Sequence, residues 1–381
     1  MEKATLGIYA HIPFCKSRCI YCDFTSSVGD CNKMDKYSEH LCRQIALGGR
    51  EYSQDYIVDT LYVGGGTPTL LSNENLIKIA NAVKDNFDCE FKEFSVEANP
   101  CTIDRDKLAA LKTAGVTRIS LGVQTFNDEL LQILGRRHDS KQAKRAIKLS
   151  KDFGFDVSVD CMLGLPKQSL DDVKEFIETA NDLNAEHISA YMLSVEDGTA
   201  LQKLIKEGKL EKKSDDELAI AYEYAYKLLK DCGYCRYEVS NFCKNSKRSV
   251  HNMKYWQGDD YLGLGLSAHS LIKGERWRNS CDFEAYFAEI ERGTLQRLDR
   301  EVLSVEDKKS EIIMLSLRLE NGLDIKRYEN IFGEKFSEVY AKALDKNANY
   351  TNYDGSRLSI KQEYLQVMNS IVADFLKYVR V

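Results

Sequence analysis

The chain has 381 residues, of which 43% are hydrophobic and 29% are charged, and its formal net charge is −6. This composition is typical of a globular protein with one large core and room for a smaller domain. The acidic balance argues against a broad nucleic-acid-binding surface, and no apolar run approaches the roughly 18 residues of a membrane helix. The 12 cysteines are scattered, unlike those of a small disulfide-stabilised domain, so we expect a reduced, cytoplasmic protein without a secretory leader or an integral membrane segment.

Short strand-like segments alternate with amphipathic helical stretches through the first two-thirds of the chain. The strands are expected at 6–12, 60–65, 93–98, 118–123, 156–163 and 187–193. The helical periodicity is clearest at 73–86, 104–114 and 169–182. Six β–α units in series predict a parallel sheet, because each crossover helix returns the chain to the same edge. They are too few to close an eight-stranded barrel, and the pattern leaves open a partial barrel or a doubly wound open sheet.

The loop after the first predicted strand carries three closely spaced cysteines, Cys15, Cys19 and Cys22. Three such thiolates can hold three irons of one [4Fe–4S] cluster and leave the fourth iron open. Zinc would need four ligands, usually in two distant pairs, and no second pair with matching spacing is obvious in the sequence. This spacing after a first strand resembles the radical SAM superfamily, which implies that S-adenosylmethionine (SAM) completes the coordination of the cluster.

Polar and glycine residues recur where the following strands end. The second strand leads into Gly64-Gly65-Gly66-Thr67-Pro68, and glycines allow a backbone to approach a ligand closely. Alone, this segment is equally compatible with a simple turn. Glu97 and Asp160 interrupt strand-like apolar runs, and because burying an unpaired carboxylate costs roughly several kcal/mol, a function is favoured for both.

The resemblance to the superfamily assigns roles to these positions. It implies that the glycine-rich turn contacts the SAM amino group, that Glu97 and Asp160 hold ribose or methionyl polar groups, and that Arg136 pairs with the carboxylate. Tyr9 and Tyr21 are expected to flank the cluster and the adenine. The expected cofactor-binding residues are Tyr9, Tyr21, Gly65, Gly66, Thr67, Glu97, Gln124, Arg136 and Asp160.

Further motifs narrow the resemblance to one family. The segments YAHIPFC, CIYCDF, GGGTP, EANP, RISLGVQTF, LGRRHD and LGLPKQS together resemble the HemN/HemW family, which contains an oxygen-independent coproporphyrinogen III oxidase and a haem chaperone. The oxidase has a fourth cysteine where this chain has Phe24, and a long arm before its cluster motif, where Cys15 here comes almost at once. Both departures favour the chaperone branch, which implies haem binding and haem transfer to an acceptor protein. The acceptor and the electron donor are not identified by the sequence.

The segment His251-Asn252-Met253-Lys254-Tyr255-Trp256 resembles a motif of the chaperone branch whose histidine is implicated in haem binding. A neutral imidazole is a usual haem ligand, and the two aromatic residues offer flat apolar contact. Without the resemblance, a core aromatic pair beside a capping histidine would be the favoured interpretation. His269, in GLGLSAH, is a second candidate ligand, whereas Cys232, Cys235 and Cys243 lack a fourth partner and are interpreted as incidental.

These observations divide the chain into three expected parts. Residues 1–235 are expected to form the radical SAM core, a partial (β/α)6 barrel, and residues 236–300 a linker that carries the haem motif. Residues 301–381 are expected to form a small winged-helix-like α+β domain. Its expected elements are helices at 306–319, 324–331 and 334–346, a hairpin at 349–361 with an Asp354-Gly355 turn, and a last helix at 363–378.

The favoured function is therefore that of a radical SAM haem chaperone rather than an enzyme, and the sequence leaves open whether SAM is cleaved. One alternative is the oxidative decarboxylation of coproporphyrinogen III, which Phe24 opposes. A second is another radical SAM reaction on a tetrapyrrole. A third is a DNA-binding regulator that combines the winged helix with an iron–sulfur sensor, which the net acidity opposes.

Overall fold

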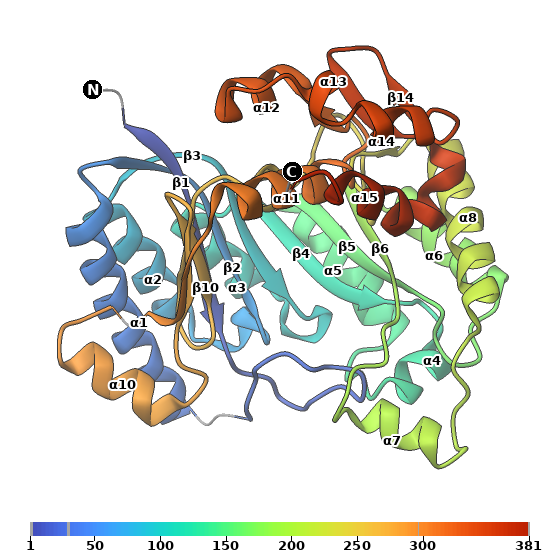
Figure 1. Ribbon diagram of the computed structural model, residues 1–381. Coiled ribbons are helices and arrows are strands. Elements are labelled where there is room, and N and C mark those ends of the chain that lie inside the picture. The colour runs from blue at the N-terminus through green and yellow to red at the C-terminus, as the bar shows by residue number, and fades with distance from the viewer. Residues whose placement is uncertain (1–2, 29–30, 296, 380–381) are drawn as a thin grey trace.

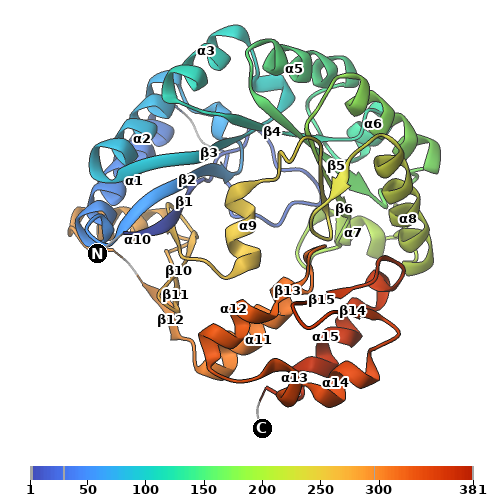
Figure 2. The ribbon, with the colours of Figure 1, turned by 90° about the horizontal axis from the view of Figure 1, so that it is seen from above.

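A curved β-sheet forms the frame of the protein, and the computed structural model describes residues 3–28, 31–295 and 297–379 (Figure 1). The centre of the sheet consists of six parallel strands in sequential order: β1 Ala4–Ile12, β2 Tyr56–Gly65, β3 Asp88–Ala98, β4 Arg118–Gln124, β5 Asp156–Leu163 and β6 His187–Met192. Viewed from above, the strands curve around an interior and the following helices lie outside (Figure 2). The predicted partial barrel is confirmed, because a doubly wound sheet would reverse its strand order and carry helices on both faces.

The outer layer consists of helices that pack their apolar side on the strands. They are α1 Cys31–Tyr52, α2 Asn73–Asn86, α3 Arg105–Ala114, α5 Ser140–Asp152 and α6 Leu170–Asp182. The short α4 Asp128–Ile133 lies at the carboxyl ends of the strands, where Leu130 packs in a small cluster with Met162 and Leu165 (Figure 1). Ser72, Asp139 and Ser169 start α2, α5 and α6, since each side chain accepts a hydrogen bond from a backbone N–H of the first turn. The three helices predicted from periodicity are found within one residue of their expected bounds, because both the apolar spacing and the caps are local signals.

Residues 236–300, which we expected to act as a linker, add strands to both edges of the sheet. After α7 Ala200–Lys206 and α8 Asp215–Asp231, the short strands β7 Cys235–Arg236 and β8 Asn241–Cys243 extend the sheet beyond β6. At the other edge, β9 pairs in parallel with β1. The elements on this side are β9 Tyr261–Leu264, β10 His269–Ile272, β11 Glu275–Arg278, α10 Phe283–Glu291 and β12 Leu298–Val302. The sheet stays open, since β12 and β7 form its opposite ends, and the division of the chain into three parts stays a prediction.

One helix of this segment, α9 Val250–Gln257, lies inside the curve of the sheet rather than on its outer face (Figure 2). It carries the motif that starts at His251. The helix packs nearer the amino ends of the central strands, on side chains of β2 and β3. It therefore separates the interior of the barrel from the C-terminal unit.

The C-terminal unit has its own core and a small antiparallel sheet with the strand order β13-β15-β14. Its elements are α11 Val305–Ser316, β13 Leu323–Asp324, α12 Ile325–Phe332, α13 Phe336–Val339, α14 Ala341–Lys346, β14 Thr351–Tyr353, β15 Arg357–Ile360 and α15 Met368–Leu376. The helix expected at 334–346 is divided in two, because Tyr340, buried in this core, takes φ −103° and ψ 17°. The start of the expected last helix is a 3-10 turn, Gln362–Val367. No helix within the described part of the chain has the length and apolarity to cross a membrane.

Candidate cluster and cofactor site

A cavity at the carboxyl ends of the central strands collects the chemistry-bearing residues of the first two-thirds of the chain. This position is where parallel α/β folds build their ligand sites, because the loops after the strands meet there. All the predicted cluster and cofactor residues except Tyr9 and His251 line it. These are Cys15, Cys19, Tyr21, Cys22, Gly65, Gly66, Thr67, Glu97, Gln124, Arg136 and Asp160.

The three cysteines lie on a loop, residues 13–27, that is closed by backbone hydrogen bonds and is called the cluster loop below. Ser27 accepts from the Cys15 N–H at 3.0 Å and donates to the Pro13 carbonyl at 2.8 Å, so the thiols of the loop are held at the cavity. All three are free thiols, and burial raises the pKa of Cys15 and of Cys22. Metal binding would therefore release protons from them.

The donor set of this loop suits a cluster better than a single ion. Within the residues described, no three His, Cys, Asp or Glu side chains converge on a point that could hold one metal ion. A mononuclear zinc site would require such convergence, whereas a cubane spreads three thiolates over three irons. Three thiols on one loop at the cavity are the donor set of a [4Fe–4S] cluster with one iron left open.

The glycine-rich turn is held between the cluster loop and Glu97. The Gly65 N–H donates to Oε2 of Glu97 at 2.8 Å, and the Gly66 N–H donates to the Ile12 carbonyl at 2.9 Å. A Cβ on Gly66 would lie 2.6 Å from the Phe14 carbonyl oxygen, and Gly65 has φ 113°. The glycines are thus required by the close packing of β2 on the cluster loop, a reason independent of any ligand.

Two carboxylates lie in the interior of this cavity. Glu97 also accepts from the Tyr62 hydroxyl at 2.8 Å, and burial raises its pKa. Burial, followed by the charge of Glu97, raises the pKa of Asp160 to about 7, while hydrogen bonds from Ser189 and Ser120 act in the opposite direction. Both groups can accept hydrogen bonds from hydroxyl or ammonium groups of a ligand, which would favour their charged forms.

Arg136 and Gln124 border the carboxylates on the side of β4. One terminal nitrogen of Arg136 lies 3.5 Å from the Cys19 sulfur, and the other donates to the Gly122 carbonyl. Its Nε is buried and has no hydrogen-bond partner in the described structure, so it can donate to a ligand carboxylate. Gln124 has φ 72° and accepts from the Tyr191 hydroxyl at 2.8 Å, so strand β4 ends in a strained residue at the cavity.

Sequence reasoning missed other lining residues, including Asn99, Cys101, Ser120 and Tyr191. A signal for Ser120 was available, because the segment RISLGVQ alternates polar and apolar residues in a strand expected to be covered on both faces. Tyr191 gave no such signal, since aromatic residues are common in strands.

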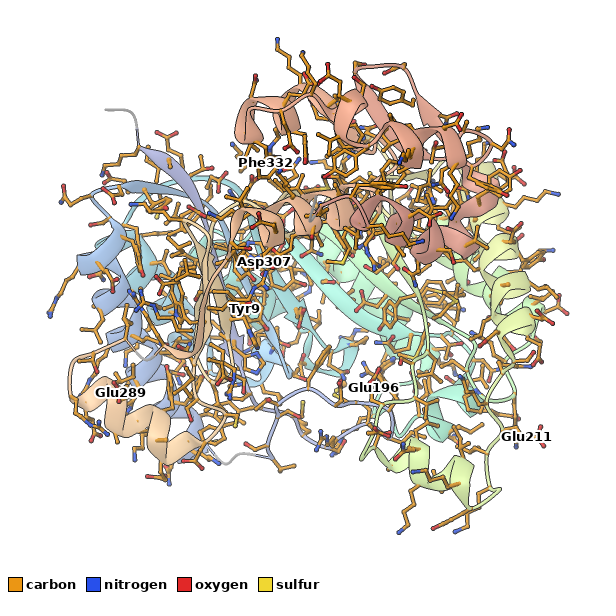
Figure 3. All side chains as sticks on the ribbon, viewed as in Figure 1. Tyr9, Glu196, Glu211, Glu289, Asp307 and Phe332 are labelled. Carbon is orange, nitrogen blue, oxygen red and sulfur yellow. The ribbon has the colours of Figure 1, made fainter. Side chains whose placement is uncertain are left out.

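Tyr9 lies in the barrel interior, away from the cavity lining (labelled in Figure 3). Its hydroxyl is 2.9 Å from Nδ1 of His11, and its ring stacks on Tyr62 with a centroid distance of 6.1 Å. His11 in turn contacts the Thr25 carbonyl of the cluster loop at 3.0 Å. Tyr9 is therefore linked to the loop that carries the three cysteines through His11.

His251 is fully buried between α9 and the barrel. Its Nδ1 is 2.9 Å from the Thr60 hydroxyl, its Nε2 is 2.8 Å from the Tyr255 hydroxyl, and its ring stacks on Tyr62. Burial, followed by the charge of Lys254, lowers its pKa to about 3, so the ring is neutral. Both ring nitrogens already have partners, whereas His269 on β10 is exposed.

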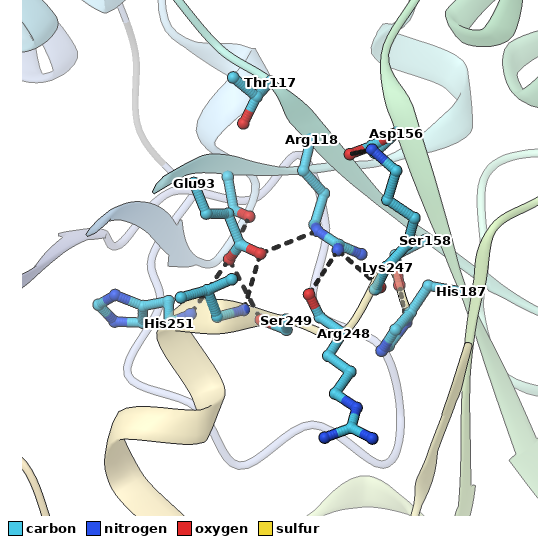
Figure 4. Close-up of polar contacts among 12 residues, drawn as sticks. Glu93, Thr117, Arg118, Asp156, Ser158, His187, Lys247, Arg248, Ser249 and His251 are labelled. Carbon is cyan, nitrogen blue, oxygen red and sulfur yellow. Dashed lines mark hydrogen bonds and ion pairs between the residues drawn. The ribbon is translucent and has the colours of Figure 1, made fainter. Parts of the chain in front are cut away.

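The start of α9 is held by a buried ion pair that sequence reasoning missed (Figure 4). Glu93 accepts from the Val250 N–H at 2.9 Å and from Nε of Arg118 at 3.2 Å. Arg118 also donates to the carbonyls of Lys247 and Arg248 at 2.8 Å. Glu93 and Arg118 are each 3% exposed. This buried ion pair and its hydrogen bonds, called the clamp below, hold the start of α9 against β3 and β4.

The open sequential barrel and the three-cysteine loop at its cavity define a protein of the radical SAM superfamily, and the model of that superfamily matches residues 9–180. Membership implies a [4Fe–4S] cluster and SAM. The model of the HemN C-terminal domain matches residues 303–363. The structure of coproporphyrinogen III oxidase (HemN) from Escherichia coli shares the fold, with a TM-score of 0.87 over 99% of this chain and 91% of that one, at 23% identity.

Similar curated proteins named heme chaperone HemW identify the family within this class. The one from Lactococcus lactis is 33% identical over 97% of this chain and 96% of its own length. The one from Bacillus subtilis is 35% identical, with 88% and 89% covered, and the one from Escherichia coli is 37% identical, with 70% of each covered. The chain belongs to the HemW family.

Proposed function

We propose that this protein is a haem chaperone that holds a [4Fe–4S] cluster on Cys15, Cys19 and Cys22, binds SAM, and passes haem to an acceptor protein. The observation that carries the proposal is the similarity, over nearly the whole chain, to proteins named heme chaperone HemW. The cavity that collects the cluster and SAM residues supports the first two parts. An electron donor for the cluster and a haem acceptor are implied partners, and the free thiols support a reducing, cytoplasmic location.

The residues around the cavity suit SAM. Nε of Arg136 would bind its carboxylate, Glu97 would accept from its amino group or ribose, and Asp160 would accept from the ribose hydroxyls. When both are bound, cluster and SAM supply the chemistry of reductive C–S cleavage. The side chains of this protein orient SAM and limit its contact with water.

The oxidase function is the weaker alternative. At 23% identity the likeness to HemN concerns the fold, and the position of the oxidase's fourth cysteine is held here by Phe24, which lines the cavity with 63% of its surface exposed. A phenyl ring can neither bind a metal ion as a thiolate does nor donate a proton. The observations therefore favour the chaperone.

His251 remains our proposed haem ligand within the motif, with one structural condition. An iron atom can reach Nε2 only after the hydrogen bond to Tyr255 is broken and α9 moves away from the barrel. Coordination would then offset the loss of that hydrogen bond. The ring is already neutral, as an axial ligand must be.

The test is an anaerobic titration of the cluster-loaded protein with haemin, followed by transfer to an apo-haem protein. We expect a saturable Soret band, and loss of the cluster when Cys15, Cys19 and Cys22 are replaced together by alanine. In parallel, the protein is incubated with coproporphyrinogen III, SAM and a reductant, and the products are measured by mass spectrometry. Decarboxylated product without saturable haemin binding would establish the oxidase instead.

A further inference from the structure

One face of β2 connects the surroundings of α9 with the cluster and cofactor cavity. Side chains alternate between the two faces of a strand, so Thr60, Tyr62 and Gly64 lie in one row on the side of the barrel interior. The row begins beside α9, where the Thr60 hydroxyl is 2.9 Å from Nδ1 of His251, and ends at the glycine-rich turn. Tyr62 is the middle residue of this row.

Tyr62 contacts a functional residue at each end of the row. Its ring stacks on the ring of His251, with a centroid distance of 5.3 Å and an angle of 29° between the planes. Its hydroxyl donates to Oε1 of Glu97 at 2.8 Å. One side chain therefore bridges the proposed haem ligand and a carboxylate of the proposed SAM site.

The bridge is closely packed at its Glu97 end. A Cβ on Gly64 would lie 2.8 Å from Cε1 of Tyr62 and 3.0 Å from Oε1 of Glu97, well inside the roughly 3.5–4.0 Å of ordinary van der Waals contact. The ring and the carboxylate thus fit together over residue 64 only because it is glycine. Displacement of the ring would change the distance and angle of its hydrogen bond to Glu97, on which the strength of that bond depends.

The hydrogen bond from Tyr62 also affects how Glu97 can bind a ligand. Burial raises the pKa of Glu97, and the hydrogen bonds from the Gly65 N–H and the Tyr62 hydroxyl act in the opposite direction. They favour the charged carboxylate, which is the form that makes charge-assisted hydrogen bonds with an ammonium group. Without the hydroxyl of Tyr62, Glu97 would therefore be a weaker acceptor for SAM.

We propose that Tyr62 is a positioning residue that couples the two ligand sites, so that SAM and haem held by His251 weaken each other's binding. The inference rests on the proposed chaperone function and adds the direction of its regulation. With α9 inside the barrel, Tyr62 is stacked on His251 and Glu97 is oriented for SAM. Iron can reach Nε2 of His251 only when α9 moves away, which takes the stacked ring from Tyr62. Because coupling between two sites is reciprocal, bound SAM in turn keeps α9 in the barrel and opposes haem binding.

The first test is a reciprocal titration of the cluster-loaded full chain under anaerobic conditions. The cluster is kept oxidised, so that SAM binds without being cleaved. Haemin is titrated with and without saturating SAM, and SAM with and without saturating haemin. We expect each ligand to raise the Kd of the other by the same factor, about fivefold or more.

A change at Tyr62 shows whether this residue carries the coupling. Tyr62→Phe keeps the ring but removes the hydroxyl, so SAM and haemin should bind nearly independently of one another. Tyr234→Phe is the matched control, since Tyr234 is also buried and its hydroxyl donates to the Ala185 carbonyl at 2.7 Å, outside both sites. The control should show the same coupling factor as the unaltered protein.

A second test uses SAM alone. His251→Ala removes the stacked ring and should weaken SAM binding by about fivefold in calorimetry, although His251 does not line the cavity. The addition of Tyr62→Phe should then cause less than the combined loss of the two single changes, because both act through the hydrogen bond to Glu97. Circular dichroism and iron content establish that each variant is folded and holds its cluster.

Independent binding of SAM and haemin in the unaltered protein overturns the inference and leaves the chaperone function standing. So does tighter haemin binding in the presence of SAM, or a mutual weakening that persists unchanged in Tyr62→Phe, since the ligands would then interact by another route. Unaltered SAM affinity in His251→Ala, or additive losses in the double variant, also overturns it. Absence of saturable haemin binding in the unaltered protein refutes the proposed function itself.

Discussion

Replacement of Arg118 by methionine would test whether the buried clamp holds α9 inside the barrel. The change keeps an unbranched side chain but removes the charge beside Glu93. The carboxylate would stay buried with its other donors, the Ser95 and Ser249 hydroxyls and the Val250 and His251 N–H groups. Breaking a buried pair in this way costs about 3–5 kcal/mol. That is a large part of the roughly 5–15 kcal/mol by which a domain is stable.

The matched change, Glu93→Gln, removes the charge and replaces one of the two acceptor oxygens by an NH2 group, while the other oxygen can still accept from the Val250 N–H. We expect a loss in the same range, about 3–5 kcal/mol, because the Arg118 guanidinium then stays buried without its carboxylate. The double variant should lose less than the sum of the two, since each change removes the same interaction.

Urea unfolding, followed by circular dichroism and by the fluorescence of the two tryptophans, Trp256 on α9 and Trp277 on β11, measures these free energies. Lys335→Gln, which breaks an exposed pair with Glu329, serves as the control and should change stability by about 0.5 kcal/mol or less. A loss below about 1 kcal/mol for Arg118→Met, or strict additivity in the double variant, would show that the clamp does not hold α9.

Three further changes test the cavity, the first two through the stability of the cluster-free protein and the third also through SAM binding to the cluster-loaded protein. The raised pKa of Asp160, about 7, means that the folded state keeps a proton that the unfolded state releases above about pH 4, so the free energy of unfolding should fall as pH rises from 4 to 7. Asp160→Asn should reduce the slope of the free energy of unfolding against pH by at most about 1.4 kcal/mol per pH unit, as measured by urea unfolding. Equal slopes for the variant and the unaltered protein would show that the pKa of Asp160 is not raised. Gly66→Ala should destabilise by about 1–3 kcal/mol, because its Cβ meets the Phe14 carbonyl, and a neutral result in thermal unfolding would exclude that contact. Tyr62→Phe should cost about 1 kcal/mol and weaken SAM binding in calorimetry, because Glu97 loses a donor; unaltered SAM affinity would place SAM away from Glu97.

The sequence alone determined the features that depend on neighbouring residues. The spacing of Cys15, Cys19 and Cys22, the glycine-rich turn and the helix caps are local patterns. The succession of β–α units also predicted the sequential parallel order, because short right-handed crossovers place consecutive strands side by side. Residues at successive strand ends were accordingly expected near one another, and the structure gathers Glu97, Gln124 and Asp160 at one cavity.

Tertiary structure decided what depends on contacts between distant segments. The pairing of β9 with β1 joins Tyr261 to Gly7, and no periodicity in the sequence marks such a partner. The side of α9 that faces the barrel is likewise set by Glu93 and Arg118, far earlier in the chain. An eight-residue helix with polar and aromatic residues all around shows no single apolar stripe, so only its packing decides that His251 is buried against the barrel.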